Sequence, residues 1–380
     1  MFTPIVIQPI NRAHWASVPS LGHLIQKLNG SNVTKSQFPS LAKAVALDPF
    51  FFETRLPCIV DWAATVPASL ARRPDGCAVV GDDVAQAHIE NSNLEVSQDM
   101  AALYSSTNQV AVERIRCLLS YFASYVDSAS SSTRKITLER RRFDKPHTES
   151  WQSVSTLPLT PPRVSLLASS MESSFATRFV DFANKLIHIH KIIASATQEE
   201  VLFSTCPEAF LGIGLCPELA DNEVILIQNV KRFAKYTGYG KSFEFDGAVE
   251  NAIVSNDAVL DILVMDAVYM SHFAAQVAPP VVTGHWGCGM FGGNKTHKFI
   301  QQWLAASVSK VERFDYALFG DTGLTEFWTN IMAVVAEKKW TVGKTYSVLL
   351  MKGTIADWKR DGSYEAYVAR VLGIKVPLQF

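Results

Sequence analysis

Two adjacent glutamates, Glu199 and Glu200, are the residues of this chain best suited to acid–base chemistry. They follow Gln198 and precede an apolar Val-Leu-Phe run. Because neighbouring side chains point in different directions, the two carboxyls cannot form the opposed pair of an ordinary glycosidase. We expect one of them to do chemistry while its neighbour binds substrate hydroxyls. The alternative is a solvated helix start, where acidic residues favour the positive end of the helix dipole.

A glycine-rich segment, TGHWGCGMFGGN at residues 283–294, leads directly into a predicted helix. Five of the ten residues from 284 to 293 are glycines, which permit positive φ angles and a close approach of the backbone. The backbone N–H groups of such a turn can cradle phosphate, although the segment matches neither the P-loop nor the dinucleotide fingerprint. A tight structural turn is the alternative.

Two other segments carry side chains that bind ligands in some proteins. Tyr236 and Tyr239 lie in a predicted strand-exit loop, where aromatic rings can stack on a base or cover a ribose, although packing is the commoner role. His188 and His190 would share one face of a strand and could chelate a metal. Since no third ligand is evident nearby, we interpret them as hydrogen-bonded or solvent-facing, and we predict no metal and no cofactor.

The composition is that of a globular chain, with 380 residues, 48% of them hydrophobic and 19% charged, and a net charge of −1. This balance excludes a global basic field that attracts nucleic acid, so a nucleotide-like ligand would need a local site. A basic cluster follows a serine-rich stretch, and we interpret it as a turn or strand edge, with a phosphate-facing patch as the alternative. It contains Lys135, Arg140, Arg141 and Arg142.

Cysteine spacing and hydropathy narrow the class of protein further. The six cysteines form no Cys-x-x-Cys pair, which favours reduced thiols over a disulfide framework or a zinc site. No run of about 18 residues is apolar and free of charge, so we predict no membrane span. Residues 1–11 lack the pattern of a signal peptide. We therefore expect a nuclear or cytoplasmic protein.

The elements that must position these residues change character near residue 150. Before it, apolar residues at helical spacing from Ile115 to Val126 predict an amphipathic helix, and Ser97 predicts the start of a shorter one. After it, strand-like runs alternate with helices, which predicts an α/β layered sandwich. The predicted strands are 179–182, 224–227, 243–245, 262–265, 281–283 and 316–319, and the predicted helices are 299–311 and 324–335.

Taken together, the chain resembles the poly(ADP-ribose) glycohydrolase family across roughly residues 90–350, because VDFAN, QEEVLF, PE, YTGY, TGHWGCGMFGGN, FGD and TVGKTY follow one another in that family's order. The resemblance implies a macrodomain-like three-layer sandwich, with a mixed sheet between helices, over residues 151–380. Residues 1–150 would form an N-terminal, mostly helical accessory region.

The implied activity is hydrolysis of the ribose–ribose O-glycosidic bonds of poly(ADP-ribose), which releases ADP-ribose and needs no metal. The implied partners are poly(ADP-ribose) or ADP-ribosylated proteins. We expect a monomer that binds neither DNA nor membranes.

The family's roles carry over residue by residue. Glu200 matches the catalytic glutamate, which would protonate the leaving ribose oxygen and then activate water, a double duty that requires a pKa raised by partial burial. Glu199 matches the neighbour that holds ribose hydroxyls, and Asp181 matches a residue that orients the catalytic loop. The positions that match substrate-binding residues are Asn184, Gln198, Tyr239, His285, Gly287, Gly289, Phe291, Gly292, Phe319 and, with a one-residue shift, Glu172.

One segment departs from the family pattern. The family carries three glycines where this chain has His188-Ile189-His190, and isoleucine strongly avoids the positive φ angles that glycine adopts. His285 is a second departure, because the family usually has asparagine there. The loop must take another path, or its side chains fill part of the ligand site. A catalytically weak or inactive relative that binds ADP-ribose or poly(ADP-ribose) is therefore the alternative function.

Overall fold

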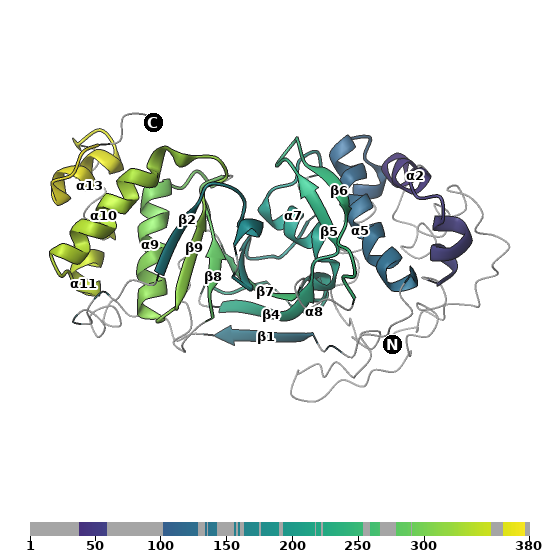
Figure 1. Ribbon diagram of the computed structural model, residues 1–380, viewed down its shortest axis with the longest axis horizontal. Helices are drawn as coiled ribbons and strands as arrows, with labels where there is room; N and C mark the ends of the chain where they lie inside the picture. The colour runs from purple at the N-terminus through teal and green to yellow at the C-terminus, as the bar shows by residue number, and fades with distance from the viewer. Residues whose placement is uncertain are drawn as a thin grey trace. The chain divides into compact units, whose positions relative to one another are not determined.

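The computed structural model (Figure 1) divides the chain into two compact units that interleave along the sequence. The first unit comprises Met1–Glu139, Leu186–Glu218 and Ile227–Leu260, and the second comprises Arg140–Lys185, Leu219–Leu226 and Asp261–Phe380. The structure describes residues 38–58, 102–127, 134, 136–142, 156, 159, 163–174, 176–189, 193–216, 218–221, 223–253, 259–266, 279–289, 291–350 and 360–376.

The first unit is mostly helical and is organised around α5 (Gln109–Asp127), which confirms the amphipathic helix predicted from Ile115 to Val126. One face of α5 packs against α2 (Pro39–Ala46) and the π-helical turn η3 (Phe51–Arg55). Another face packs against the antiparallel hairpin of β5 (Ala234–Thr237) and β6 (Glu244–Ala248), so α5 lies between α2 and the hairpin (Figure 1).

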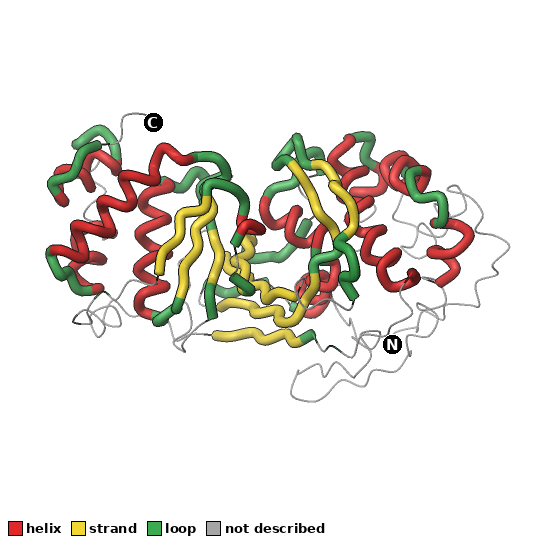
Figure 2. Tube along the Cα trace, in the orientation of Figure 1, coloured by secondary structure: helices red, strands yellow, loops and turns green. Residues whose placement is uncertain are grey.

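Three shorter helices of the first unit follow one another closely. They are α7 (Gln198–Thr205), the 3-10 turn η6 (Pro207–Ala209) and α8 (Phe210–Leu215). The short helix predicted after Ser97 is present at residues 102–105, whereas Ser97 itself lies outside the described residues. Of the residues described before position 136, those in regular elements are all helical, as Figure 2 shows. The predicted helical N-terminal region is therefore confirmed, and its boundary near residue 150 stays a prediction.

A seven-stranded sheet runs in the order β1-β4-β7-β3-β8-β9-β2. The pairs β7–β3, β3–β8, β8–β9 and β9–β2 are parallel. The strands are β1 (Thr137–Arg142), β2 (Arg163–Leu167), β3 (Arg178–Ala183), β4 (Glu223–Lys231), β7 (Val259–Asp266), β8 (Val281–Thr283) and β9 (Arg313–Ala317). Four of the predicted strands fall within β3, β4, β7 and β8, and a fifth, 316–319, overlaps β9, whereas the segment at 243–245 overlaps β6 of the separate hairpin.

The strand predicted at 316–319 ends earlier than expected. β9 stops at Ala317, because Phe319 and Gly320 have φ angles of 50° and 83°, which an extended strand cannot accommodate. The basic segment before residue 143 forms β1 at the edge of the sheet, where Arg140 pairs with Glu223 through its Nε at 3.1 Å. This agrees with the strand-edge interpretation, and Lys135 lies outside the described residues.

Four helices of the second unit gather beside β9 and β2: α9 (Lys295–Val308), α10 (Thr325–Glu337), α11 (Val342–Thr345) and α13 (Tyr364–Leu372) (Figure 1). Their core is aromatic, with Phe299 stacked on Trp328 at a centroid distance of 4.4 Å and edge-on to Tyr316 at 5.3 Å. The predicted helix at 299–311 ends at Val308, because Lys310 has a φ of 52°. The α/β class, with helices packed on a sheet, is confirmed.

Two further predictions can be compared with the structure. No helix in the described part of the chain is both long and apolar enough to cross a membrane. Five cysteines are free thiols, namely Cys58, Cys117, Cys206, Cys216 and Cys288.

Candidate functional site

The two adjacent glutamates lie in the first turn of α7, directly after its N-cap residue Thr197. Glu200 accepts a hydrogen bond from the Thr197 backbone N–H at 3.0 Å and another from the Thr197 hydroxyl. The helix-start interpretation is therefore right about their place. It is wrong about their solvation, since Glu200 is 1% exposed and Glu199 is 7% exposed.

Burial gives Glu200 the ionisation behaviour that acid catalysis needs. Desolvation raises the pKa of its carboxyl above the ordinary value, and it outweighs the opposing effects of the Thr197 hydrogen bond and the positive charge of Arg114. A carboxylic acid with a raised pKa keeps its proton to higher pH and can donate it to a leaving group.

Glu199 has a different partner, the loop that replaces the family's glycines. Its Oε1 accepts a hydrogen bond from the backbone N–H of His188 at 3.3 Å. His188 and Ile189 are both buried, and neither has a positive φ angle. At these two positions the loop thus follows a path that a β-branched residue tolerates, as the sequence predicts. His190 lies outside the described residues.

Arg114 on α5 is a residue that the sequence interpretation missed. It is fully buried, and its guanidinium donates to the Ile189 carbonyl at 2.8 Å and to the Ser204 hydroxyl at 3.4 Å. Burial lowers its pKa to about 10, and the negative charge of Glu200 is the largest effect in the opposite direction. The available signal is its spacing: Arg114 falls between Val110 and Leu118 in an apolar stripe, and arginine is rarely buried without a partner.

The tyrosine loop lies beside the start of α7 in the same unit. Ala196, two residues before the helix, exchanges backbone hydrogen bonds with Gly240 at 3.0 and 2.9 Å. Tyr239 is 46% exposed, whereas the ring of Tyr236 stacks on that of Phe243 at a centroid distance of 5.4 Å. The packing interpretation therefore suits Tyr236, and contact of Tyr239 with a ligand stays a prediction.

In the second unit, Asp181 is a fully buried residue of β3, and Asn184 follows the strand and accepts the Lys185 N–H at 2.7 Å. The glycine-rich segment after β8 closes on itself, because the Gly293 N–H donates to the Gly287 carbonyl at 2.9 Å. A Cβ at Gly293 would come within 2.7 Å of that carbonyl oxygen. A Cβ at Gly289 would meet nothing within 4 Å, so a tight turn does not explain that glycine.

His285 is held by β9 and by the residue that follows it. Its Nε2 lies 3.2 Å from the Leu318 carbonyl oxygen and its Nδ1 lies 3.4 Å from the Tyr316 hydroxyl. Because the carbonyl can only accept, Nε2 carries the proton and Nδ1 accepts from the tyrosine. Burial lowers the pKa of His285 to about 4, so the ring is neutral at pH 7. Its predicted contact with substrate stays a prediction.

Phe319 is held in an uncommon backbone conformation. A left-handed φ costs a bulky residue about 1–3 kcal/mol, and such conformations cluster at functional sites. Here the φ of 50° is supported by the Phe319 N–H, which donates to the Ser169 carbonyl at 3.3 Å. The ring lies against Gly284, where a Cβ would come within 3.0 Å of its Cε2. Phe291 is 48% exposed, and Glu172 lies in the 3-10 turn η5 (Met171–Ser173).

The predicted site residues thus fall into two groups. The first unit brings together the start of α7, the loop before it and the tyrosine loop, with Gln198, Glu199, Glu200 and Tyr239. The second unit carries Glu172, Asp181, Asn184, His285, Gly287, Gly289, Phe291, Gly292 and Phe319. Within the described ranges, no three His, Cys, Asp or Glu side chains are placed to hold a metal ion.

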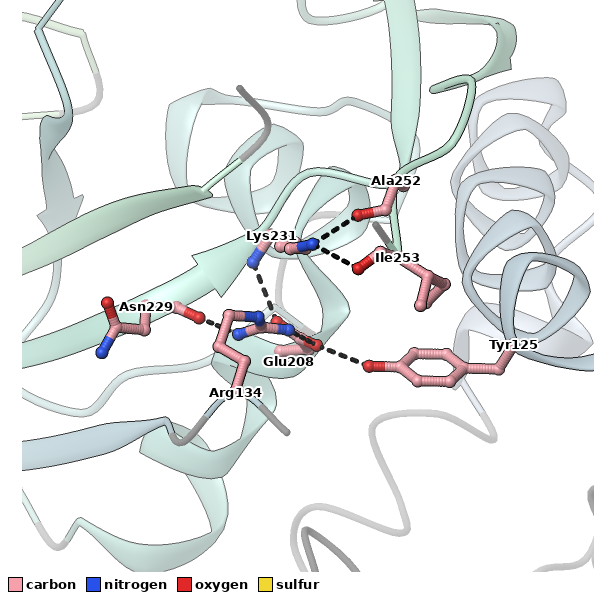
Figure 3. Close-up of polar contacts among 7 residues, drawn as sticks. All are labelled: Tyr125, Arg134, Glu208, Asn229, Lys231, Ala252 and Ile253. Carbon is pink, nitrogen blue, oxygen red and sulfur yellow. Dashed lines mark hydrogen bonds and ion pairs between the residues drawn. The ribbon is translucent and has the colours of Figure 1, made fainter. Parts of the chain in front are cut away.

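A second buried group of charges lies just beyond α7 and accounts for the Pro-Glu pair of the sequence pattern (Figure 3). Glu208 accepts hydrogen bonds from the Tyr125 hydroxyl at 3.0 Å, from the Lys231 backbone N–H at 2.8 Å and from the guanidinium of Arg134. The Lys231 ammonium donates to the carbonyls of Ala252 and Ile253 at 2.7 and 2.6 Å. We call these residues the Glu208 cluster.

Comparison with known proteins bears on the family. A family model described as Poly (ADP-ribose) glycohydrolase (PARG), Macro domain fold, matches residues 149–278 and 270–326. Poly(ADP-ribose) glycohydrolase 2 of Caenorhabditis elegans is 25% identical over 314 residues, which cover 72% of this chain and 64% of that protein. Poly(ADP-ribose) glycohydrolase 1 of Arabidopsis thaliana is 24% identical over 366 residues, which cover 72% and 66%. The chain spans less than two thirds of either relative.

The similarity of the chain to solved structures is low. The poly(ADP-ribose) glycohydrolase of Thermomonospora curvata matches with a TM-score of 0.30 and 12% identity, over 48% of this chain and 80% of that one. The Deinococcus radiodurans enzyme in complex with ADP-ribose matches with a TM-score of 0.27 and 12% identity, over 50% and 94%. Scores this low do not establish a shared fold, so the macrodomain assignment depends on the family model and on the sheet itself. That match and these relatives confirm the resemblance of the chain to the poly(ADP-ribose) glycohydrolase family.

Proposed function

We propose that this protein hydrolyses the ribose–ribose O-glycosidic bonds of poly(ADP-ribose) and releases ADP-ribose, with Glu200 as its acid and base. The observation that carries the proposal is a buried glutamate in the first turn of α7 whose pKa is raised by desolvation. Such a group is expensive to bury and is typical of an active site. A poly(ADP-ribose) substrate would place the protein in the nucleus or the cytoplasm.

The reaction needs only one carboxyl and one water molecule. Protonated Glu200 donates its proton to the leaving ribose oxygen as the bond from that oxygen to the anomeric carbon breaks. The resulting Glu200 carboxylate then takes a proton from water, whose oxygen forms the new bond to the anomeric carbon. The carboxyl ends protonated, as it began, and each product carries the hydroxyl that the chemistry requires.

The other predicted residues keep the roles that the resemblance implies. Glu199 would hold ribose hydroxyls, and Tyr239 would cover the sugar from its exposed loop. In the second unit, Phe319 would stack on adenine, and the open space at Gly289 suits a ligand that approaches the backbone.

A binding protein without turnover is the second candidate, and the buried His188 and Ile189 favour it. Glycines at these two positions would leave the space of both side chains empty. Such a protein would bind ADP-ribose and release none from the polymer.

The test is release of ADP-ribose from automodified poly(ADP-ribose) polymer by the wild type and by Glu200→Gln. The glutamine can still accept the Thr197 N–H, so the variant should fold and bind ADP-ribose while its release is lost. Glu326→Gln is the matched control, because Glu326 also lies in the first turn of a helix but is exposed. Full activity of Glu200→Gln would refute the mechanism, and no release by the wild type, with ADP-ribose bound, would favour the second candidate.

A further inference from the structure

The loop that replaces the family's glycines is held from two sides by charged side chains. On one side, the Glu199 carboxylate accepts the His188 N–H at 3.3 Å. On the other, the Arg114 guanidinium donates to the Ile189 carbonyl at 2.8 Å. Two neighbouring residues of the loop are thus fixed by an acidic side chain of α7 and by a basic side chain of α5.

The same guanidinium also reaches α7 itself, because its Nε lies 3.4 Å from the Ser204 hydroxyl near the end of that helix. The complete burial of Arg114 disfavours its charged form. The negative charges of Glu200 and Glu199 favour the charged form and oppose this cost. A buried arginine without such partners would be strongly destabilising, so its place depends on them.

We propose that Arg114 is a positioning residue for Glu200: hydrogen bonds tie it to the His188-Ile189 loop and to Ser204 of α7, and its charge acts on Glu200 at the start of that helix. The inference rests on the proposed function, because it names a residue that tunes the same acid. It also explains how a loop without the family's glycines is compatible with an intact pair of glutamates.

The charge of Arg114 has a consequence that can be measured. It lowers the pKa of Glu200 and so opposes the larger effect of burial. A hydrogen bond from Thr197 at the helix start also lowers the pKa of Glu200, and the charge of Glu200 raises the pKa of Tyr239 on the neighbouring loop. Glu199 and Cys117 act on the pKa of Arg114. Removal of the guanidinium should therefore raise the pKa of Glu200 further.

The experiment compares Arg114→Met with Arg116→Met, a control on the same helix. Arg116 is part-exposed, pairs with Glu113 at 2.7 Å and lies over the Phe245 ring at 4.7 Å. We expect Arg114→Met to lower kcat/KM for ADP-ribose release by about 10²-fold, as misplacement of a catalytic group does. Its activity should also persist to higher pH than that of the wild type, because release stops when Glu200 loses its proton. Arg116→Met should keep the wild-type pH profile.

A structural role alone would lower activity without moving the pH profile, so an unchanged profile in folded Arg114→Met would overturn the proposal. If Arg114→Met does not fold, the variant Arg114→Lys tests the proposal instead. Lysine keeps the charge, but its single ammonium replaces the two guanidinium nitrogens that contact Ile189 and Ser204. We expect a wild-type pH profile with faster hydrogen exchange of the amides at 186–189, and wild-type exchange there would contradict the tether.

The two proposals can fail separately. If the wild type releases no ADP-ribose at any pH, the proposed function fails, and the hydrogen exchange of the loop in the Arg114 and Arg116 variants still tests the tether. If the wild type is active and both variants share its pH profile and its loop exchange, the proposed function stands and the role of Arg114 is refuted.

Discussion

The two buried groups of charges in the first unit, at the start of α7 and in the Glu208 cluster, are built from the same residue types with different results. Glu208 accepts from a hydroxyl, a backbone N–H and a guanidinium that come from three separate parts of the chain. Glu200 is as deeply buried, but its hydrogen bonds from Thr197 are local and do not offset its desolvation. Donors from several elements make a buried carboxylate a structural anchor, whereas a shortage of them leaves a carboxyl that keeps its proton to higher pH.

The comparison also shows how close the two roles lie along the chain. Glu208 lies eight positions after Glu200, and each glutamate is near the start of a short helical segment. We interpret Glu200 as a proton donor to substrate and Glu208 as a residue that fixes its segment in place. Their variants should therefore fail in opposite ways, in activity for one and in stability for the other.

The largest difference should come from Glu200→Gln. Loss of a general acid and base lowers a rate by about 10²–10⁴-fold, so ADP-ribose release should fall by at least that factor. At mildly acidic pH, where Glu200 is protonated, the unfolding midpoint in urea should change little. Kinetic assays and urea titrations on one preparation check the rate of release and the unfolding midpoint. A large loss of stability with little loss of specific activity would remove the distinction between the two groups.

Glu208→Gln should show the converse. It breaks a buried ion pair and leaves Arg134 without its charged partner, so we expect a loss of about 3–5 kcal/mol in the free energy of unfolding. The specific activity of the folded fraction should stay near that of the wild type. Glu250→Gln, an exposed position in the same unit, is the control and should change neither quantity. A selective loss of activity in folded Glu208→Gln would show that this cluster is catalytic.

The pH dependence of stability sharpens the same contrast. Because the folded-state pKa of Glu200 is raised, the stability linked to its protonated form is present in full below the unfolded-state pKa and is lost as pH rises through the folded-state pKa. Glu200→Gln has no such loss. Relative to the wild type it should gain stability as pH rises from acid to neutral, which urea titrations across that range would detect. A constant difference would mean that burial does not perturb this carboxyl.

The smallest effect should come from Thr197, whose hydrogen bond lowers the pKa of Glu200. Thr197→Val removes the hydroxyl but keeps the shape, so it should cost about 1 kcal/mol as a lost cap and should extend activity to higher pH. Thr197→Ser keeps the hydroxyl and should behave as the wild type in both respects. If the serine and valine variants have the same pH profile, the hydroxyl does not tune the acid.

Much of this could be predicted from the sequence, because it depends on short-range patterns. Alternating or continuous apolar runs locate the strands, and helical spacing locates α5, α9 and α10. The errors fall where one residue turns the chain, as Lys310 and Phe319 do with their positive φ angles. Neither residue type favours that conformation, so no local signal reveals it.

The sequence could single out Glu199 and Glu200 as candidate site residues, but it could not reveal the side chains that support them. Glu200 stands out because paired acids beside apolar sequence are unusual, and its burial follows from that sequence. Arg114 was missed because its partners, Ile189 and Ser204, lie 75 and 90 positions away, and only the folded chain brings them together. The interleaving of the two units has the same cause, since it depends on contacts between distant segments.

The most direct test of the central claim is the pH profile of ADP-ribose release by the wild-type protein acting on poly(ADP-ribose). If protonated Glu200 is the acid, release should be substantial at mildly acidic pH and should decline as pH rises through its raised pKa. Release that does not depend on pH across this range, or no release while ADP-ribose binds, would contradict the account.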